Sequence, residues 1–340
     1  MVICCSREIK RSRGFFCIFS YFRSGLIARP FLIQGYCNAS IAMRQIQRKI
    51  INNKLLILNY LFLITNYLCY TVLNGGDRMT CKTLLHFNFK GGVGKTTLSV
   101  MDTYLLGELG HKVLLIDLDP QANATEIMRT TYDVKTEPNV DLFNGLLKLD
   151  LTHSIIELTD NVSMIPADWS LSLWPGKVEK IKNHDRMLIL KTLIEQFKSQ
   201  FEYIIIDVPP TLSIFTNNAI LASDYVSLVL QTQKQAYTSV LKTAQYMYQL
   251  KNDYHATFDV SGVILYLVKR DAKVDREITK AATESFGDAV FINRIWQQER
   301  VKLFSNAGIK DEDYWDKKAI SMYTMVLKEE LHRIEEINNG

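Results

Sequence analysis

From residue 79 onward, the chain alternates between short runs that are apolar at nearly every position and longer runs with the apolar spacing of helices. Short runs of this kind predict strands whose two faces are both buried, because a strand with one solvated face alternates polar and apolar side chains. The predicted strands are residues 83–89, 112–118, 162–165, 203–208, 225–230 and 260–268.

The longer runs between these strands predict helices. They cover residues 96–109, 122–129, 186–200, 215–222, 236–250, 274–286 and 319–337. Strands that alternate with helices form a mostly parallel, twisted sheet with helices on both faces, and ligands bind at the carboxyl ends of its strands. The predicted fold class is therefore α/β, in one domain at residues 79–340.

The first predicted strand runs directly into a glycine-rich loop with the sequence KGGVGKTT, at residues 90–97. Its glycines permit a tight turn whose N–H groups point inward, Lys95 supplies positive charge for β- and γ-phosphates, and the Thr96 hydroxyl suits Mg²⁺. A strand, a glycine loop and a helix start in this order predict an ATP site of the P-loop NTPase type. The predicted nucleotide-binding residues are Gly91, Gly92, Val93, Gly94, Lys95, Thr96 and Thr97.

Two further segments place acidic residues at strand ends. Asp117 and Asp119 follow an apolar run, and two residues at i and i+2 point to the same side of a strand. Asp207 ends another apolar run, which is the Walker B pattern of a carboxylate that holds Mg²⁺ through water. An alternative role for one of the first two aspartates is to cap the helix predicted to begin at residue 122.

Together these motifs resemble those of the ParA-type partition ATPases, whose P-loop is a deviant Walker A box with a second, signature lysine. Lys90 stands at the place of that lysine. The run DLDPQAN at residues 117–123 resembles the family's D-x-D-P-Q-G-N box, with Ala122 instead of glycine, and residues 207–210 resemble its D-x-P-P. The resemblance extends over residues 82–337.

The resemblance implies a role for each matching residue. Lys90 would reach the phosphates of ATP bound by the partner subunit in an ATP-sandwich homodimer, which would tie hydrolysis to dimerisation. Asp119 would orient or activate the attacking water, and Pro210 would fix the loop beneath the nucleotide. The implied catalytic residues are Lys90, Lys95 and Asp119, and the implied Mg²⁺ residues are Thr96, Asp117 and Asp207.

The resemblance also implies a function in the segregation of plasmid or chromosomal DNA. Such a protein binds DNA without sequence preference in its ATP state, and a ParB-like adaptor at a centromere-like site stimulates hydrolysis and release. The nearest matches to the family's DNA-binding residues are Arg300, Lys302, Lys317 and Lys318. Residues 269–318 hold 11 basic and 10 acidic side chains, so a solvated face of mixed charge is the alternative.

The first 78 residues differ in composition from the rest. They hold 11 of the 40 Lys and Arg but 2 of the 36 Asp and Glu, so their net charge is +9 and that of the remainder is −5. Residues 55–73 form an apolar stretch long enough for a membrane span, which makes a membrane-associated positioning ATPase of the MinD type the alternative function. Codons available for residues 74–78 contain a ribosome-binding sequence, so we expect a natural start at Met79 and a non-native or disordered extension at 1–78.

Other relatives that share the deviant loop fit the sequence less well. No cysteine follows Cys81, which argues against the iron–sulfur relatives and favours a cytoplasmic protein without disulfides. The last predicted helix is amphipathic but acidic, which disfavours binding to anionic lipids. We therefore expect a cytoplasmic, nucleoid-associated protein. A nucleotide-dependent scaffold is a third alternative.

Overall fold

The computed structural model describes residues 81–269 and 272–339. The predicted extension at 1–78, together with its apolar stretch at 55–73, lies outside the described residues. Within the two described ranges, no helix combines the length and the apolar character needed to cross a membrane.

In the described part of the chain, seven strands form one sheet in the order β3-β4-β2-β5-β1-β6-β7. The paired strands are parallel except β3 and β4. The strands are β1 (Lys82–Phe87), β2 (Val113–Asp117), β3 (Ile156–Glu157), β4 (Val162–Ile165), β5 (Tyr203–Asp207), β6 (Tyr225–Gln231) and β7 (Asp259–Tyr266). This sheet confirms the predicted α/β fold.

The strand order brings the ends of three central strands together. Strand β1 lies between β5 and β6, and β2 pairs with β5 on the other side. Every residue of β2 and β5 is buried, as their continuous apolar runs predicted. The register sets Asp117 beside Asp207 at the carboxyl ends of these two strands.

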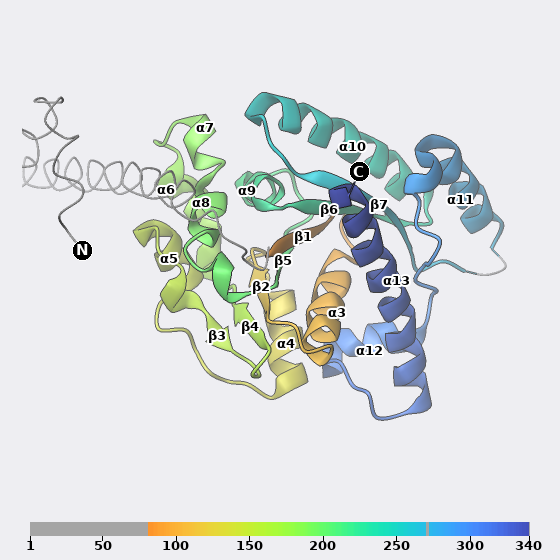
Figure 1. Cartoon of the computed structure of the whole chain (residues 1–340), viewed down its shortest axis with the longest axis horizontal. Coiled ribbons are helices and arrows are strands. Elements are labelled where there is room, and N and C mark those ends of the chain that lie inside the picture. Colours follow the sequence, from red (N-terminus) through yellow and green to blue (C-terminus); the bar gives the residue numbers. More distant parts are fainter. Residues whose placement is uncertain (1–80, 270–271, 340) are drawn as a thin grey trace, which may run out of the picture. The chain divides into compact units, whose positions relative to one another are not determined.

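Helices cover both faces of the sheet. Figure 1 shows α9 and α10 on one face and α3 and α13 on the other, and α12 contacts both α4 and α13. The longer helices are α3 (Lys95–Glu108), α4 (Asn123–Tyr132), α9 (Ile214–Ala222), α10 (Lys234–Tyr254), α11 (Lys273–Phe286), α12 (Glu299–Ala307) and α13 (Tyr314–Asn339). The shorter helices are α5 (Leu142–Lys148), α6 (Trp174–Val178), α7 (Asn183–Arg186) and α8 (Ile189–Ile194).

The prediction of one continuous helix at residues 186–200 was wrong. The segment divides into α7, α8 and a short 3-10 turn. The side chain of Asn218 in α9 occupies the first break: its amide donates to the carbonyl oxygen of Arg186 at 2.9 Å, and its Oδ1 accepts from the N–H of Leu190 at 3.0 Å. A tertiary contact therefore supplies the backbone hydrogen bonds that a continuous helix would make internally.

The last helix is longer than its apolar pattern predicted. It begins at Tyr314 rather than at residue 319 because Asp313 caps it, with Oδ1 accepting from the backbone N–H groups of Trp315 at 2.7 Å and Asp316 at 2.9 Å. Helices α5 and α12 were not predicted, since their apolar spacing covers few turns.

Candidate nucleotide site

The loop between β1 and α3 turns through two glycines in the left-handed region. Gly92 has φ 73° and Gly94 has φ 101°, angles that favour glycine. Gly94 also lies against the ring of Tyr266 at the end of β7, because a Cβ on Gly94 would stand 2.1 Å from Tyr266 Cε1. The backbone angle and this close approach both exclude a side chain at position 94.

Lys95 begins α3 and folds its side chain back over the loop. The residue is 5% exposed, and its Nζ donates to the carbonyl oxygen of Lys90 at 3.2 Å. Burial lowers the pKa of Lys95, although the charges of Asp207 and Asp119 oppose this effect. The ammonium group is thus held within the loop and close to two carboxylates.

Behind the loop, Asp117 and Asp207 form a buried carboxylate pair. Asp117 is fully hydrogen-bonded: Oδ1 accepts from the N–H of Asp119 at 3.0 Å, and Oδ2 accepts from the N–H and hydroxyl of Thr125 at 2.9 and 2.8 Å. Burial and the neighbouring charge of Asp207 raise the pKa of Asp117 to about 7, against these hydrogen bonds. The contacts of Asp117 hold the start of α4 beside the end of β2.

Asp207 has a free oxygen. Its carboxylate accepts from the Thr96 hydroxyl and from the Ser99 hydroxyl, the latter at 3.3 Å, while Oδ2 has no hydrogen-bond partner. Burial raises the pKa of Asp207 to about 6, against the hydrogen bond from Thr96 and the charge of Lys95. A buried carboxylate oxygen without a donor, next to a threonine hydroxyl, fits a divalent cation with oxygen ligands.

Lys95 and Thr96 line a cavity of about 440 Å³, which we call the nucleotide cavity, whereas the buried Asp117 and Asp207 do not line it. Several predicted site residues line it, namely Gly92, Gly94, Lys95, Thr96, Thr97, Asp119 and Pro210. Asp119 is 9% exposed, and its Oδ1 accepts from the N–H of Gln121 at 3.0 Å. The carboxylate is therefore oriented by the turn before α4 while it still faces the cavity.

Other predicted residues stand behind the cavity wall or outside it. Gly91 and Val93 do not line the nucleotide cavity, and Val93 is buried in the core. Lys90 does not line the cavity either, and its Nζ donates to Gln233 Oε1 at 3.0 Å, just before α10. The Lys90 ammonium group is therefore hydrogen-bonded outside the nucleotide cavity, although the Lys90 carbonyl oxygen accepts from Lys95 within the loop.

Two of the four predicted DNA-binding residues line a second cavity of about 980 Å³, which we call the groove. Arg300 and Lys318 line it together with Lys269 and Trp315, whereas exposed Lys317 does not. The guanidinium of Arg300 is paired with Asp313 and, at 3.0 Å, with Asp316, so two carboxylates balance its charge. The fourth predicted residue, Lys302, belongs to α12, and its side chain is outside the described part.

Sequence comparison is consistent with this geometry. Residues 81–260, more than half of the chain, match the profile of an AAA domain family. The chain is 31% identical over 241 residues to the chromosome-partitioning ATPase Soj of Treponema pallidum, a match that covers 68% of the chain and 90% of the relative. It is 30% identical to the chromosome partitioning protein ParA of Caulobacter vibrioides, over 65% of the chain and 82% of the relative.

The chain belongs to the ParA-type P-loop ATPases. Solved structures share this ParA-type fold. An ATP complex of McdA from Cyanothece aligns with a TM-score of 0.67 at 24% identity, over 74% of this chain and 97% of McdA. A putative plasmid partition protein from Borrelia burgdorferi bound to AMPPNP aligns with a TM-score of 0.60 at 24% identity, over 73% and 99% of the two chains.

Several residues of this ParA-type site were not predicted from the sequence. Ser99 and Thr125 hydrogen-bond to the two buried aspartates, and Tyr266 covers the glycine loop. The lining of the nucleotide cavity also includes Gln297 and Gln298, just before α12. The position of Ser99, four residues after Lys95 on the same helix face, was a signal for the first of these contacts.

Proposed function

We propose that this protein is an ATPase of a DNA-partition system that binds ATP with Mg²⁺ in the nucleotide cavity. One observation carries the proposal: a loop closed to side chains at Gly94 lines a cavity and holds the Lys95 ammonium near a buried carboxylate with a free oxygen. The identity to partition proteins from Treponema and Caulobacter supports the cellular role.

In this proposal each side chain has a distinct task. The loop N–H groups and Lys95 bind the β- and γ-phosphates, and the Thr96 hydroxyl and Asp207 hold Mg²⁺, which neutralises charge between those phosphates. Asp117 keeps the end of β2 in place through Thr125. Asp119 faces the cavity from the start of the next segment and orients or activates the attacking water.

We further propose that hydrolysis requires two subunits. The Lys90 ammonium does not face the cavity of its own subunit, and its exposed hydrogen bond to Gln233 is easily exchanged. In an ATP-bound homodimer this lysine would reach the phosphates held by the partner, where its positive charge would stabilise the transition state. A ParB-like adaptor would then act by promoting this arrangement.

Two lysine variants of the full chain test the nucleotide part. Lys95→Ala is expected to lose binding of a fluorescent ATP analogue, whereas Lys90→Ala is expected to bind it and to lose phosphate release. Light scattering with and without ATP would measure dimerisation in each variant. Wild-type hydrolysis by Lys90→Ala would contradict the two-subunit proposal and leave the nucleotide cavity assignment intact.

We propose the groove as the DNA-binding surface. Lys318 lies over the Trp315 ring with Nζ 5.1 Å from its centroid, and both side chains are exposed. Lys269 adds a further ammonium group to the same surface. A local cluster of this size suits contacts to phosphates, which give binding without sequence preference and with strong salt dependence. Arg300 contributes less because Asp313 and Asp316 already pair with it.

Binding to random-sequence duplex DNA tests this surface. We expect the full chain to bind with ATP, and to bind poorly with ADP or without nucleotide, at one stated salt concentration. Lys318→Ala should weaken binding and reduce its salt dependence. Lys280→Ala is the matched control, since Lys280 is an exposed lysine paired with Glu284 on α11. Absence of DNA binding in every state, with dimerisation by ATP intact, would rule out the DNA role.

A further inference from the structure

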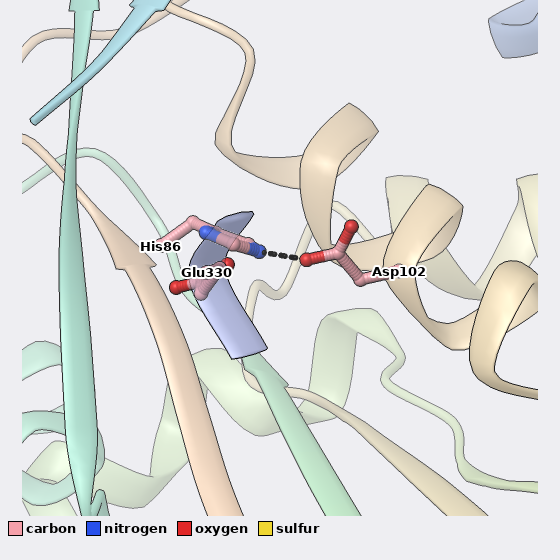
Figure 2. Close-up of side chains that lie close together, drawn as sticks. All are labelled: His86, Asp102 and Glu330. Atoms are coloured by element: carbon pink, nitrogen blue, oxygen red, sulfur yellow. Dashed lines mark hydrogen bonds and ion pairs between the residues drawn. The ribbon is translucent and has the colours of Figure 1, made fainter. Parts of the chain in front are cut away.

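A second group of charged side chains lies in the core, apart from the nucleotide cavity. His86 in β1, Asp102 in α3 and Glu330 in α13 come together between the sheet and the two helices (Figure 2). One ligand atom from each residue lies within 4.8 Å of the other two. We call these three residues the His86 cluster. All three are buried, and each is 1% exposed.

The hydrogen bonds of the cluster leave two carboxylate oxygens free. His86 Nε2 and Asp102 Oδ2 are 2.8 Å apart, and Glu330 Oε1 accepts from the Ser261 hydroxyl at 3.2 Å. Asp102 Oδ1 and Glu330 Oε2 have no hydrogen-bond partner. A buried carboxylate oxygen without a donor is costly, so two of them beside one imidazole call for an additional positive group.

The electrostatics of the cluster favour a cation. Burial alone would lower the pKa of His86, but the charges of Glu330 and Asp102 outweigh burial and raise this pKa to about 9. Burial in turn raises the pKa of Glu330 to about 7, against the charge of His86, so the Glu330 carboxylate depends on a positive charge beside it. A divalent ion would balance both carboxylates at once, which a single imidazolium does not.

The surroundings of His86 match those of a metal ligand. Its Nδ1 lies 2.6 Å from the Ser227 hydroxyl oxygen. A proton on Nδ1 that is donated to Ser227 leaves the Nε2 lone pair available to a metal ion on the side of Asp102. Metal-binding histidines are oriented in this way by a hydrogen bond to the other ring nitrogen. Ser261 provides the corresponding contact for Glu330. Each of these two potential ligands thus has its own supporting hydroxyl.

We propose that His86, Asp102 and Glu330 bind a divalent transition-metal ion of the zinc class in the core. One imidazole nitrogen and two carboxylate oxygens form a ligand set suited to such an ion. The metal would replace the hydrogen bond between His86 and Asp102 with one bond to each residue, and His86 would give up its Nε2 proton. Because the three residues come from β1, α3 and α13, the ion would join the closing helix to the helix that begins at the phosphate loop. It would be captured as the chain folds.

Metal analysis of the full chain tests the site directly. The protein would be purified without a metal-affinity step and in the absence of nucleotide, and its zinc, iron and manganese content measured by mass spectrometry. About one ion per chain is expected. His86→Gln and Glu330→Gln should each lose it, and Glu335→Gln, an exposed acid on the same helix, should retain it.

Thermal unfolding of the wild-type chain provides a second measurement that needs no variant. A chelator should lower the unfolding temperature, zinc should restore it, and Mg²⁺ should not, which separates this site from the nucleotide cavity. Glu330→Gln should show no response to the chelator. A metal-free wild-type chain whose unfolding temperature is unchanged by zinc would overturn the proposal and show that protons alone balance the cluster.

Discussion

Helix α3 carries two groups of buried charges that differ in their access to solvent. Its first residue, Lys95, supplies the ammonium group of the nucleotide cavity, and about two turns later Asp102 belongs to the His86 cluster (Figures 1 and 2). The first group contains one ammonium group and three carboxylates, of Asp117, Asp119 and Asp207, and the second contains one imidazole and two carboxylates. The first opens onto a cavity of about 440 Å³, whereas all three residues of the second are 1% exposed.

The difference in access determines what each group can do. In the open site, a nucleotide and its Mg²⁺ enter and leave, so the charge on the site changes with each cycle of the proposed ATPase. In the enclosed site, the positive charge that balances the carboxylates must be acquired on folding and retained. Helix α3 thus contributes Lys95 to a site where nucleotide is exchanged, and Asp102 to a proposed site where a bound ion would hold α13 against α3.

The largest effect is expected from removing the basic residue of the enclosed site. His86→Leu leaves two carboxylates in the core without a cation and should lower the free energy of unfolding by ~3–5 kcal/mol. His111→Leu is a matched control, because His111 Nδ1 also lies 2.8 Å from a carboxylate oxygen, in Glu202, but at the surface. It should cost ~0–1 kcal/mol. Urea denaturation of both variants measures the difference, and equal losses would contradict the importance of burial.

At the open site, the corresponding change should affect activity rather than folding. Lys95→Ala removes the ammonium group from the phosphate loop and should lower kcat/KM for ATP by ~10²–10³-fold, the usual effect of losing one charged group that stabilises a transition state. The free energy of unfolding should fall less than in His86→Leu, since water can enter the cavity in place of the ammonium group and solvate the carboxylates. Steady-state phosphate release and urea denaturation on one preparation would check both statements.

Alanine substitutions at the two loop glycines should have a smaller effect on stability, and Gly92→Ala serves as the control for Gly94→Ala. The methyl group added in Gly92→Ala would have no neighbouring atom within 4 Å. This variant should therefore lose only the ~1–2 kcal/mol of stability that alanine costs in the left-handed region. Gly94→Ala has this cost and also places a methyl group 2.1 Å from the Tyr266 ring, which adds ~1–3 kcal/mol for overpacking. Gly94→Ala should therefore unfold at a lower temperature than Gly92→Ala. The reverse order would show that Tyr266 moves away without cost.

The open site was largely predictable from the sequence because its parts are local. The glycine loop lies within eight residues, and each acid directly ends an apolar strand, so strand order alone brings Asp117 and Asp207 together. What the sequence did not indicate is the second layer of contacts. Tyr266 reaches the loop from β7, a strand whose pattern gave no sign of contact with Gly94.

The enclosed site was not predictable, because nothing local marks it. His86 is one polar residue in an apolar strand, Asp102 lies within a helix, and Glu330 is one of several acids in an acidic closing helix. Their meeting depends on how α13 packs on α3, which periodicity does not determine. The break between α7 and α8 at Asn218 was missed for the same reason: a tertiary hydrogen bond replaced a helical one.

The smallest expected effect concerns Ala122, which lies beside the open site with its backbone in the left-handed region. Its φ is 55° and ψ is 31° at the residue before α4, where related ATPases were expected to have glycine. Alanine in this conformation lowers the stability by ~1–2 kcal/mol. Glycine would remove that strain, but it would lower the stability by ~0.4–1 kcal/mol because it gives the unfolded chain more conformational freedom. Ala122→Gly should therefore stabilise the protein by ~0.5 kcal/mol.

Asp133 provides the matched control for this prediction. It also has a positive φ, 51°, at the other end of α4, but aspartate tolerates the left-handed region better than alanine. Asp133→Gly should give a smaller gain or none. Thermal unfolding of the two variants tests the difference, and a loss of stability in Ala122→Gly would show that the alanine methyl group contributes packing at the start of α4. Either result bears on the open site, because the same turn carries the Asp119 carboxylate that faces the nucleotide cavity.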